Sequence, residues 1–300
     1  MVHKTPLMLE QHIHGAFGVD FNKASSDEVI AVADKLLNFG IGKFFPTLVT
    51  DSAENIKRQV EIIKSASSKC PQILGIHLEG IFINPEKKGI HNPKHFLKLT
   101  KENYQIIEDD FIKIVTLAPE LDNGLINYLK QKGVKVQAGH CVGGDLKNLS
   151  GVTHTFNAMS GISHRGKSTA LSALINDFVY TEIIADGVHV SEDALNLFFR
   201  SKPKDKIILV SDALPITYSD MKEAVFADSK IYYDGIKATS KNGTIAGSTT
   251  LLDKIMKQLE RMGFMDSIFI ENPYNYHSIE PEGEIIWDNN WNIIEIKGGK

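Results

Sequence analysis

The chain has 300 residues, of which 42% are hydrophobic, and its formal net charge is −4 at pH 7. This composition supports a large packed core, and the acidic balance argues against a nucleic-acid-binding protein, which usually carries a basic stripe. Because no apolar segment approaches the roughly 18 residues of a membrane span and the N-terminus lacks a signal-peptide pattern, we expect a cytoplasmic protein without a membrane partner.

Short apolar runs alternate with amphipathic segments through the first half of the chain. Four runs are expected to be strands: PLMLEQHIH (6–14), KFFPTLV (43–49), ILGIHLEG (73–80) and FIKIVTLAPE (111–120). Apolar residues at helical spacing predict helices at 26–38, 52–65 and 121–131, the first of them capped by Ser25 or Ser26.

The same alternation continues through the second half. Four further strands are expected at GVKVQAGH (133–140), VTHTFNAM (152–159), FVYTEIIADG (178–187) and KIILVSDA (206–213). Helices are predicted at 145–149, which is unusually short, and at 169–175, 192–199 and 250–262. Asp-Gly and Asn-Gly turn signals predict a hairpin-like pair within 230–247, and the alternating segment 283–299 predicts a second hairpin that turns at Asn289-Asn290.

Eight strands with intervening helices and no glycine- or proline-rich linker indicate one parallel α/β domain. A (β/α)8 barrel fits eight such units in about 250 residues, and a doubly wound open sheet is the alternative. We favour the barrel because polar residues lie where its strands end, which is where such barrels place their active sites. The expected division is a barrel domain over 1–280 and a C-terminal hairpin over 281–300.

The residues at these strand ends are metal ligands by type. They are His12 and His14 on the first strand, Glu79 on the third, His140 on the fifth, His154 on the sixth and Asp212 on the eighth. One such histidine alone is more often a hydrogen-bonded core residue, so the joint pattern carries the argument. Imidazole and carboxylate together suit zinc, and also iron, cobalt or manganese.

Two ligand sets can be drawn from these residues. Three protein ligands with one open position describe a catalytic site, and Glu79, His140 and His154 make such a set. His12, His14 and a bridging Glu79 can hold a second ion. We therefore expect one or two divalent metals per chain.

Nine stretches of the chain match one known family in the same order. They are HIHG (12–15), GIHLEGIFINPEKKGIHNP (75–93), VTLAPE (115–120), AGH (138–140), THTFNAM (153–159), HRG (164–166), IIADGVHV (183–190), LVSDA (209–213) and NGTIAGST (242–249). On these motifs the chain resembles the N-acetylglucosamine-6-phosphate deacetylases of the amidohydrolase superfamily over about Met8 to Gly263. The long motif at 75–93 and THTFNAM are highly specific in combination, whereas H-x-H or Asp-Ala alone would be weak.

The resemblance implies roles for the matching positions. The family's metal ligands match Glu79, His140, His154, His12 and His14, the last two being the pair present in its two-metal members. Its catalytic aspartate matches Asp212, and the histidine that polarises the substrate carbonyl matches His91. The resemblance also implies an amidohydrolase-type (β/α)8 TIM barrel.

Substrate contacts are implied as well. The matching positions are Ile90, His91, Asn157, Ala158, Arg165, Asp186, His189, Ile245, Ala246 and Gly247. Arg165 matches the arginine that reaches the sugar phosphate, in the family usually across a dimer interface, so the resemblance implies a homodimer. A guanidinium suits phosphate because its donors are forked and its charge is permanent.

The family's reaction is the hydrolysis of N-acetylglucosamine-6-phosphate to glucosamine-6-phosphate and acetate. An acetamide needs a strong nucleophile, and a bound metal lowers the pKa of water to about 7. Asp212 can take the proton from that water and return it to the departing amine, while His91 can stabilise the developing oxyanion.

The chain departs from the family pattern in several places. It begins almost at its first strand, so the family's small β-sandwich is expected to be reduced to the C-terminal hairpin with Trp287 and Trp291. Ile81 stands where the family usually has proline, and Gly166-Lys167-Ser168 follows Arg165 in place of proline-glycine. These changes leave the metal centre untouched and fall partly on the phosphate end of the pocket.

Three other functions remain open. The hexose epimer is not defined, so N-acetylgalactosamine-6-phosphate is an alternative substrate. A cyclic-amide hydrolase would bridge two metals with a modified lysine late on the fourth strand, but Lys113 lies early on it. A non-catalytic sugar-phosphate-binding relic is the alternative from another class, and the intact Asp212 with all five metal positions argues against it.

Overall fold

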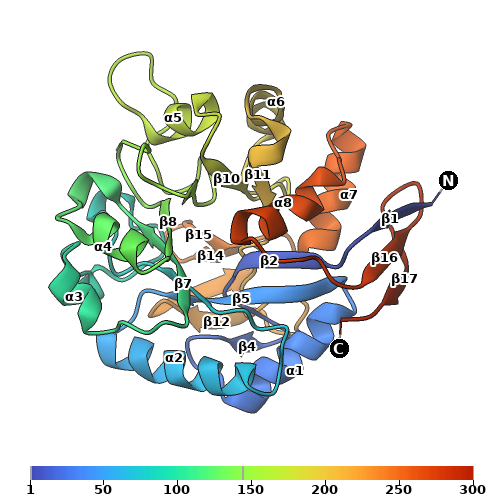
Figure 1. Cartoon of the computed structure of the whole chain (residues 1–300), viewed down its shortest axis with the longest axis horizontal. Helices are drawn as coiled ribbons and strands as arrows, with labels where there is room; N and C mark the ends of the chain where they lie inside the picture. The colour runs from blue at the N-terminus through green and yellow to red at the C-terminus, as the bar shows by residue number, and fades with distance from the viewer. Residues whose placement is uncertain (1, 144, 300) are drawn as a thin grey trace.

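Eight parallel strands form a barrel in the computed structural model of the protein, which describes residues 2–143 and 145–299 (Figure 1). In pairing order the strands are β2 (Met8–Ile13), β5 (Ile41–Val49), β6 (Ile76–Glu79), β7 (Ile112–Leu117), β8 (Lys135–Ala138), β9 (Gly151–Val152), β10 (Tyr180–Ile183) and β11 (Ile207–Leu209). The first and last strands meet at their C-terminal ends, where the N–H of Asp212 donates to the His12 carbonyl at 2.9 Å. The predicted (β/α)8 barrel is confirmed.

Helices lie outside the strands (Figure 1). Their bounds are α1 (Ser26–Leu37), α2 (Ala53–Ser67), α3 (Lys101–Gln105), α4 (Leu125–Gln131), α5 (Thr169–Ile175), α6 (Glu192–Ser201), α7 (Leu252–Met262) and α8 (Ile268–His277). Helix α1 begins where the sequence predicts because Ser25 and Glu28 make a capping box. Its apolar face, which includes Val29, Val32 and Leu36, packs into the main core between helices and barrel.

Three helical segments differ from those predicted, and one of them is α3, which was not predicted. The predicted helix at 145–149 is wrong, because this segment forms turns in which the Lys147 N–H donates to the Asp145 side chain at 2.9 Å. A short polar side chain that bonds the backbone in this way competes with a helix. Helix α8 was not predicted because Pro273 lies inside it and its buried residues give a weak helical period.

A four-stranded antiparallel sheet lies beside the open end of the barrel. It consists of β12 (Glu223–Phe226), β13 (Ser229–Tyr233), β14 (Ala238–Ser240) and β15 (Ile245–Gly247), so the sheet has four strands where the sequence predicts a hairpin-like pair. The N–H of Ser248, directly after β15, donates to the Asp212 carbonyl at 2.8 Å. This bond ties β15 to the end of the eighth barrel strand.

The C-terminal hairpin belongs to a sheet that joins both ends of the chain. β16 (Glu284–Trp287) pairs with β17 (Ile293–Lys297) as predicted, and β1 (His3–Thr5) pairs with the other edge of β16. The buried Trp287 indole donates from Nε1 to the Thr5 hydroxyl at 2.8 Å. The division into 1–280 and 281–300 stays a prediction, and the sheet draws on residues from both sides of it.

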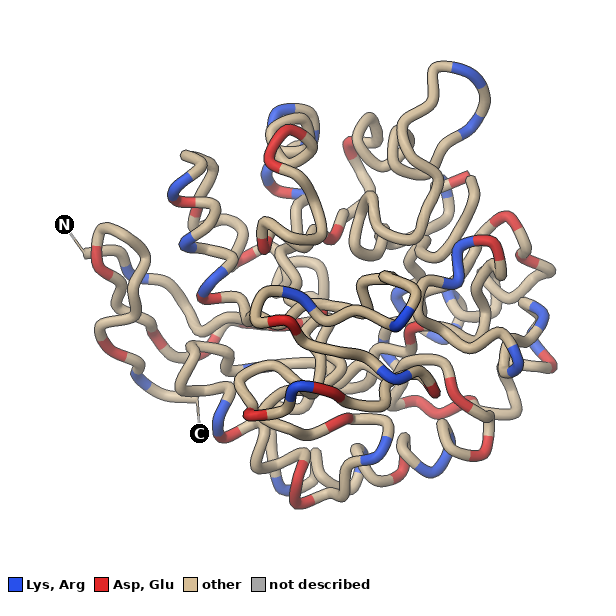
Figure 2. Tube along the Cα trace, turned by 180° about the vertical axis from the view of Figure 1, so that it is seen from behind, with Lys and Arg blue, Asp and Glu red and all other residues tan. Residues whose placement is uncertain are grey.

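Smaller features complete the fold. β3 (Gly15–Ala16) and β4 (Val19–Asp20) form a short hairpin after the first barrel strand. Basic and acidic residues are interspersed along the chain trace (Figure 2). Among the helices that the structure describes, none is both long and apolar enough to cross a membrane.

Candidate active site

A cavity of about 170 Å³ lies at the C-terminal ends of the barrel strands. Among the side chains that line it are His14, Glu79, His91, His140, His154 and Asp212. All of them are at least nine-tenths buried, and His12, fully buried, touches the cluster through Nε2. The structure thus brings together all six residues that the sequence places at strand ends, and adds His91 from the loop after β6.

Three of these residues sit on strained backbone just after their strands. The φ angles are 49° at His140, 28° at His154 and 52° at Asp212, all in the left-handed region that non-glycine residues rarely adopt. Such conformations cost about 1–3 kcal/mol each and cluster at functional sites. From these positions His140 and His154 reach Glu79, the last residue of β6, and Asp212 reaches His12 and His14.

Glu79, His140 and His154 form the first ligand set. The Oε1 atom of Glu79 lies 2.7 Å from Nε2 of His154 and 3.1 Å from Nε2 of His140, and the two Nε2 atoms are 3.2 Å apart. Nδ1 of His140 lies 2.8 Å from the Lys87 carbonyl, to which it can only donate, so Nε2 is the ring nitrogen left to bind a metal. A cation between these acceptors removes their repulsion, and the donor types fit a divalent metal.

His12, His14 and Asp212 form the second set. Nε2 of His14 lies 3.0 Å from the Oε2 atom of Glu79 and 3.2 Å from Oδ1 of Asp212, and Nε2 of His12 lies 3.4 Å from the same Oδ1 atom. Nδ1 of His14 lies 3.2 Å from the Thr47 carbonyl, to which it can only donate, so Nε2 is the ring nitrogen left to bind a metal. Glu79 therefore reaches both sets, with Oε2 near His14 and Oε1 near His140, His154 and, at 3.5 Å, His12.

The charges in this cluster favour a cation. Burial, which lowers the pKa of an imidazole, is outweighed by the hydrogen bonds to Asp212 and Glu79, and the pKa of His14 rises to about 9. Burial also acts to raise the pKa of both carboxyl groups, but the neighbouring imidazoles outweigh it, so the pKa of Glu79 and of Asp212 stays below its ordinary value. Both carboxylates are thus ionised at neutral pH.

His91 presents a hydrogen-bond donor to the cavity. Nε2 of His91 lies 3.6 Å from Oε2 of Glu79, a carboxylate oxygen that can only accept, and this favours a ring proton on Nε2. Nδ1 of the neutral ring then accepts from the Thr50 hydroxyl, 2.7 Å away, while that hydroxyl accepts from the Ile81 N–H at 2.9 Å. Burial, together with the nearby His140, lowers the pKa of His91 to about 4, which keeps the ring neutral.

Most of the predicted substrate contacts line the same cavity. Besides His91 they are Ile90, Asn157, Ala158, His189, Ile245, Ala246 and Gly247. β15 supplies the last three, held in place by its bond to the end of the eighth strand. Gly89, Phe226 and Thr244 also line the cavity and were not predicted, because none of them carries an imidazole, a carboxylate or a cationic group.

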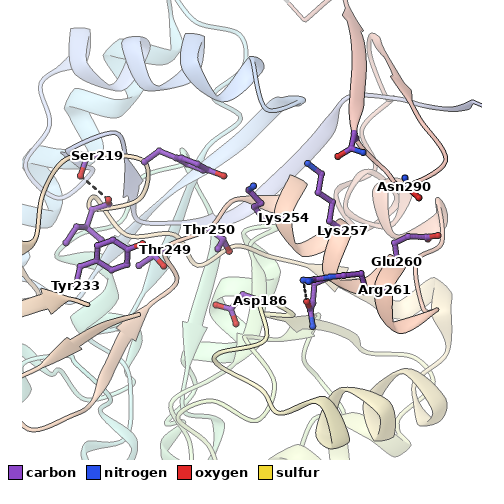
Figure 3. A pocket seen from close by; sticks show the side chains of 14 residues that line it. Asp186, Ser219, Tyr233, Thr249, Thr250, Lys254, Lys257, Glu260, Arg261 and Asn290 are labelled. Atoms are coloured by element: carbon purple, nitrogen blue, oxygen red, sulfur yellow. Dashed lines mark hydrogen bonds between the residues drawn. The ribbon is translucent and has the colours of Figure 1, made fainter. Parts of the chain in front are cut away.

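Two predicted contacts lie elsewhere. Arg165 is exposed on the loop before α5 and does not line this cavity. Asp186 lines a separate, larger cavity of about 920 Å³, which is shown in Figure 3 with Lys254, Lys257 and Arg261 on its α7 wall. Asp186 bonds Nδ1 of His189 at 2.8 Å and so orients a side chain of the smaller cavity. The imidazoles and carboxylates converge in the smaller cavity, so we take this cavity as the candidate active site.

Sequence reasoning missed two buried carboxylates beneath the site. Glu10 accepts from the backbone N–H groups of His12 and Ser211, each at 2.9 Å, and Glu182 lies 3.0 Å from Nδ1 of His12. The sequence singled out Glu79 by its place at a strand end, whereas Glu10 and Glu182 lie within β2 and β10 and carry no such signal. His77 is not free to bind a metal, because Gln11 and Thr116 engage its two ring nitrogens.

The fold and the site define a class: an amidohydrolase-type (β/α)8 barrel with two candidate metal-ligand sets at its C-terminal end. No family model matches the chain. The N-acetylglucosamine-6-phosphate deacetylase of Bos taurus is 32% identical over 279 residues, which is 84% of this chain and 68% of that protein. The crystal structure of the Pasteurella multocida N-acetylglucosamine-6-phosphate deacetylase has a TM-score of 0.89 at 25% identity and covers 99% of this chain and 85% of that one.

The chain belongs to the N-acetylglucosamine-6-phosphate deacetylase family, which confirms the resemblance found in its motifs. It is also similar to the N-acetylgalactosamine-6-phosphate deacetylase of Escherichia coli O157:H7, at 28% identity over 85% of this chain and 71% of that protein. The chain spans about two thirds of the length of the first curated relatives it matches.

Proposed function

We propose that the protein is a metal-dependent hydrolase that removes the acetyl group from N-acetylglucosamine-6-phosphate and yields glucosamine-6-phosphate and acetate. The observation that carries this proposal is the convergence of Glu79 with four imidazoles and Asp212 in one buried cavity. Family membership supports the same substrate class. Both cysteines are free thiols, which fits a reducing cytoplasm, and a phosphorylated substrate fits that location too.

Glu79, His140 and His154 would hold one divalent metal, and His12 and His14 would hold a second together with Glu79. Zinc is the first candidate for these nitrogen and oxygen donors, with iron, cobalt and manganese as alternatives. When bound, such a metal supplies Lewis acidity, which lowers the pKa of water and polarises a carbonyl. The cavity walls keep bulk water away from these groups.

Asp212 and His91 have complementary tasks at the reacting amide. Asp212 is an ionised carboxylate held on both sides by backbone hydrogen bonds, to His12 and Ser248, so it can accept a proton from the attacking water. The same carboxyl group then returns the proton to the departing amine. His91 offers its Nε2–H to the carbonyl oxygen as negative charge develops there.

The phosphate end of the substrate involves Arg165 and, we propose, a second copy of the chain. Large apolar side chains are exposed in the same segment: Ile162 is 50% exposed, Ile175 70% and Phe178 87%. Exposed apolar groups of this size often mark an interface. In a homodimer that covers this segment, Arg165 can reach the partner's cavity, which explains why it does not line its own.

Replacing Arg165 by alanine is expected to raise KM for the phosphorylated substrate by roughly 10- to 100-fold. This change corresponds to the loss of about 1.5–3 kcal/mol of binding free energy, the usual contribution of a hydrogen bond between charged groups. The effect on kcat should be smaller because phosphate is remote from the amide. Lys167→Ala, an exposed cation on the same loop, is the matched control and should retain the wild-type KM. Equal KM values for Arg165→Ala and wild type would exclude the phosphate role.

The substrate itself is tested by direct comparison. Metal-replete protein should release amine from N-acetylglucosamine-6-phosphate, and exhaustive chelation should abolish the release until metal is restored. N-acetylgalactosamine-6-phosphate is the second candidate, favoured by the similarity to a deacetylase of that sugar, and the higher kcat/KM decides between them. No amine release from either sugar by metal-replete protein would refute the proposed function.

A further inference from the structure

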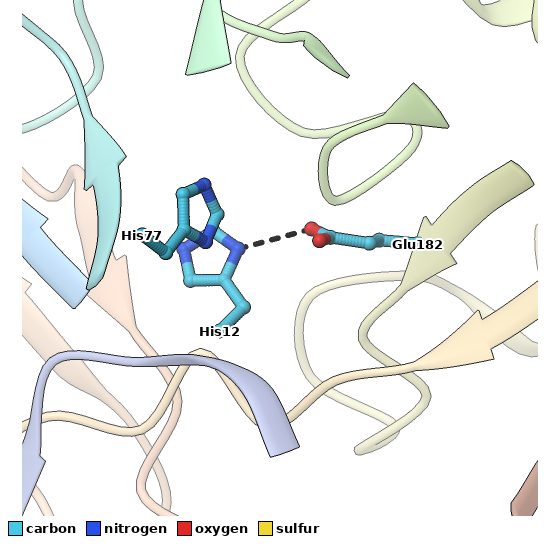
Figure 4. A group of neighbouring side chains, drawn as sticks. All are labelled: His12, His77 and Glu182. Atoms are coloured by element: carbon cyan, nitrogen blue, oxygen red, sulfur yellow. Dashed lines mark hydrogen bonds and ion pairs between the residues drawn. The ribbon is translucent and has the colours of Figure 1, made fainter. Parts of the chain in front are cut away.

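A buried carboxylate lies directly behind His12, on the side away from the cavity (Figure 4). Glu182 belongs to β10, is 1% exposed, and places Oε2 3.0 Å from Nδ1 of His12. The same oxygen accepts from the backbone N–H of His154 at 3.3 Å. Its position is therefore defined from two of the strand ends that build the site.

The other oxygen of Glu182 is also engaged. Gln11 donates from Nε2 to Oε1 of Glu182 at 2.5 Å, and the amide oxygen of Gln11 lies 3.0 Å from Nε2 of His277 in α8. Because the Gln11 amide nitrogen faces the carboxylate, its oxygen must accept from the His277 ring. The backbone N–H of His154 and the side-chain amide N–H of Gln11 can only donate, so both oxygens of Glu182 act as acceptors.

This arrangement selects one tautomer of His12. A proton on Nδ1 makes a hydrogen bond to Glu182, whereas a lone pair there would face an accepting oxygen at 3.0 Å. With the proton on Nδ1, the neutral ring has its lone pair on Nε2. That atom has no hydrogen-bond partner among the described residues and lies 3.4–3.5 Å from oxygens of Asp212 and Glu79.

We propose that Glu182 is a positioning residue that holds His12 as the Nδ1–H tautomer, so that its Nε2 lone pair can bind the second divalent metal with His14 and Glu79. The inference rests on the metal dependence in the proposed function. Carboxylates behind ligating histidines orient the ring and raise its basicity, and their loss typically lowers metal affinity about 10- to 100-fold. The chain His277–Gln11–Glu182 in turn fixes the carboxylate from outside the site.

The same residues do not form a metal site of their own. His12, His77 and Glu182 lie close enough to suggest one. However, Gln11 and Thr116 already engage both ring nitrogens of His77, and both oxygens of Glu182 already accept hydrogen bonds. The group is therefore a support for His12.

The test is a Glu182→Gln exchange with metal binding as the readout. A glutamine has one acceptor, so its amide N–H must face an N–H of either Gln11 or His12. We expect the affinity for the second equivalent of Zn²⁺, titrated into metal-free protein by calorimetry, to fall about 10- to 100-fold. The first equivalent should bind nearly as in wild type, and thermal melting should show that each variant is folded.

A second variant separates orientation from charge. In Glu182→Gln combined with Gln11→Glu, the glutamine can accept from His12 and donate to the new carboxylate, which still accepts from His277. The complementary hydrogen-bond pattern is restored, and the negative charge now lies on residue 11, one residue further from the His12 ring in the chain of hydrogen bonds. We therefore expect this double variant to regain most of the affinity for the second Zn²⁺.

Gln137→Leu is the matched control. Gln137 is buried in the same barrel interior and bonds Thr153 and Tyr276, and among the described residues it has no hydrogen bond to His12 or Glu182. Its loss should lower the melting temperature and leave both Zn²⁺ affinities unchanged. Unchanged Zn²⁺ binding in Glu182→Gln, a single equivalent in wild type, or a double variant that fails to recover would each overturn the inference. Wild-type protein that binds no metal at all would instead refute the proposed function.

Discussion

Replacing Asp212 by asparagine is expected to lower kcat by roughly 10²- to 10⁴-fold, the range that positioned general acid–base groups supply. Asparagine keeps the size and the backbone bonds of the residue, but it cannot take a proton from water. The variant should retain the metal held by Glu79, His140 and His154, because Asp212 is not part of that set. Steady-state amine release and metal analysis on the same sample measure both quantities.

Asp253→Asn provides the matched control for this exchange. Asp253 is also a buried aspartate, but it lies in α7, and burial raises the pKa of its carboxyl group. Its replacement should leave kcat close to that of wild type. Wild-type turnover in Asp212→Asn would exclude Asp212 as the base, and a parallel loss of metal would show that it acts as an essential ligand instead.

Glu79→Gln is expected to abolish turnover and to remove the stabilisation that metal confers. Glu79 is the one carboxylate that reaches both ligand sets, within 3.1 Å of His14, His140 and His154. A metal at 100 times its dissociation constant stabilises the folded state by about 2.7 kcal/mol, so wild type should melt at a higher temperature when metal is added. The variant should melt at the same temperature with and without metal.

Glu120→Gln controls for the loss of a carboxylate near the site. Glu120 lies just after β7 and accepts from Asn84 and from the backbone of Val142, away from the imidazole cluster. Its replacement should preserve both the metal-dependent rise in melting temperature and the turnover. A Glu79→Gln protein that keeps its metal and turns over substrate would contradict the assignment of Glu79 as the shared ligand.

The barrel and most of the cavity could be predicted from the sequence because both depend on local signals. Strand residues alternate sides, and parallel strands in a barrel end on one face, so polar residues at successive strand ends must converge. His12, His14, Glu79, His140 and Asp212 follow that rule, and the structure brings them together. The functional roles of these residues remain predictions until the variants are measured.

The remaining features depend on contacts that no local pattern encodes. Glu182 contacts His12, which lies 170 residues away in the sequence, and the closed barrel brings the two side chains together. The strained backbone at His154 and the place of Arg165 outside its own cavity likewise follow from how the loops leave the barrel. The predicted helix at 145–149 failed because a side-chain bond from Asp145 outweighs a weak periodic signal.

The sheet that joins β1 to β16 and β17 pairs segments that are synthesised at different times. Domains emerge from the ribosome N-terminal end first, at about 5–20 residues per second. β1 and its partner β16 are far apart in the sequence, with a separation of 282 residues from Thr5 to Trp287, and such long-range pairings are slow to form. β1 therefore emerges without its partner strand, and the bond from Trp287 to Thr5 can form only after the whole barrel sequence between them has been made.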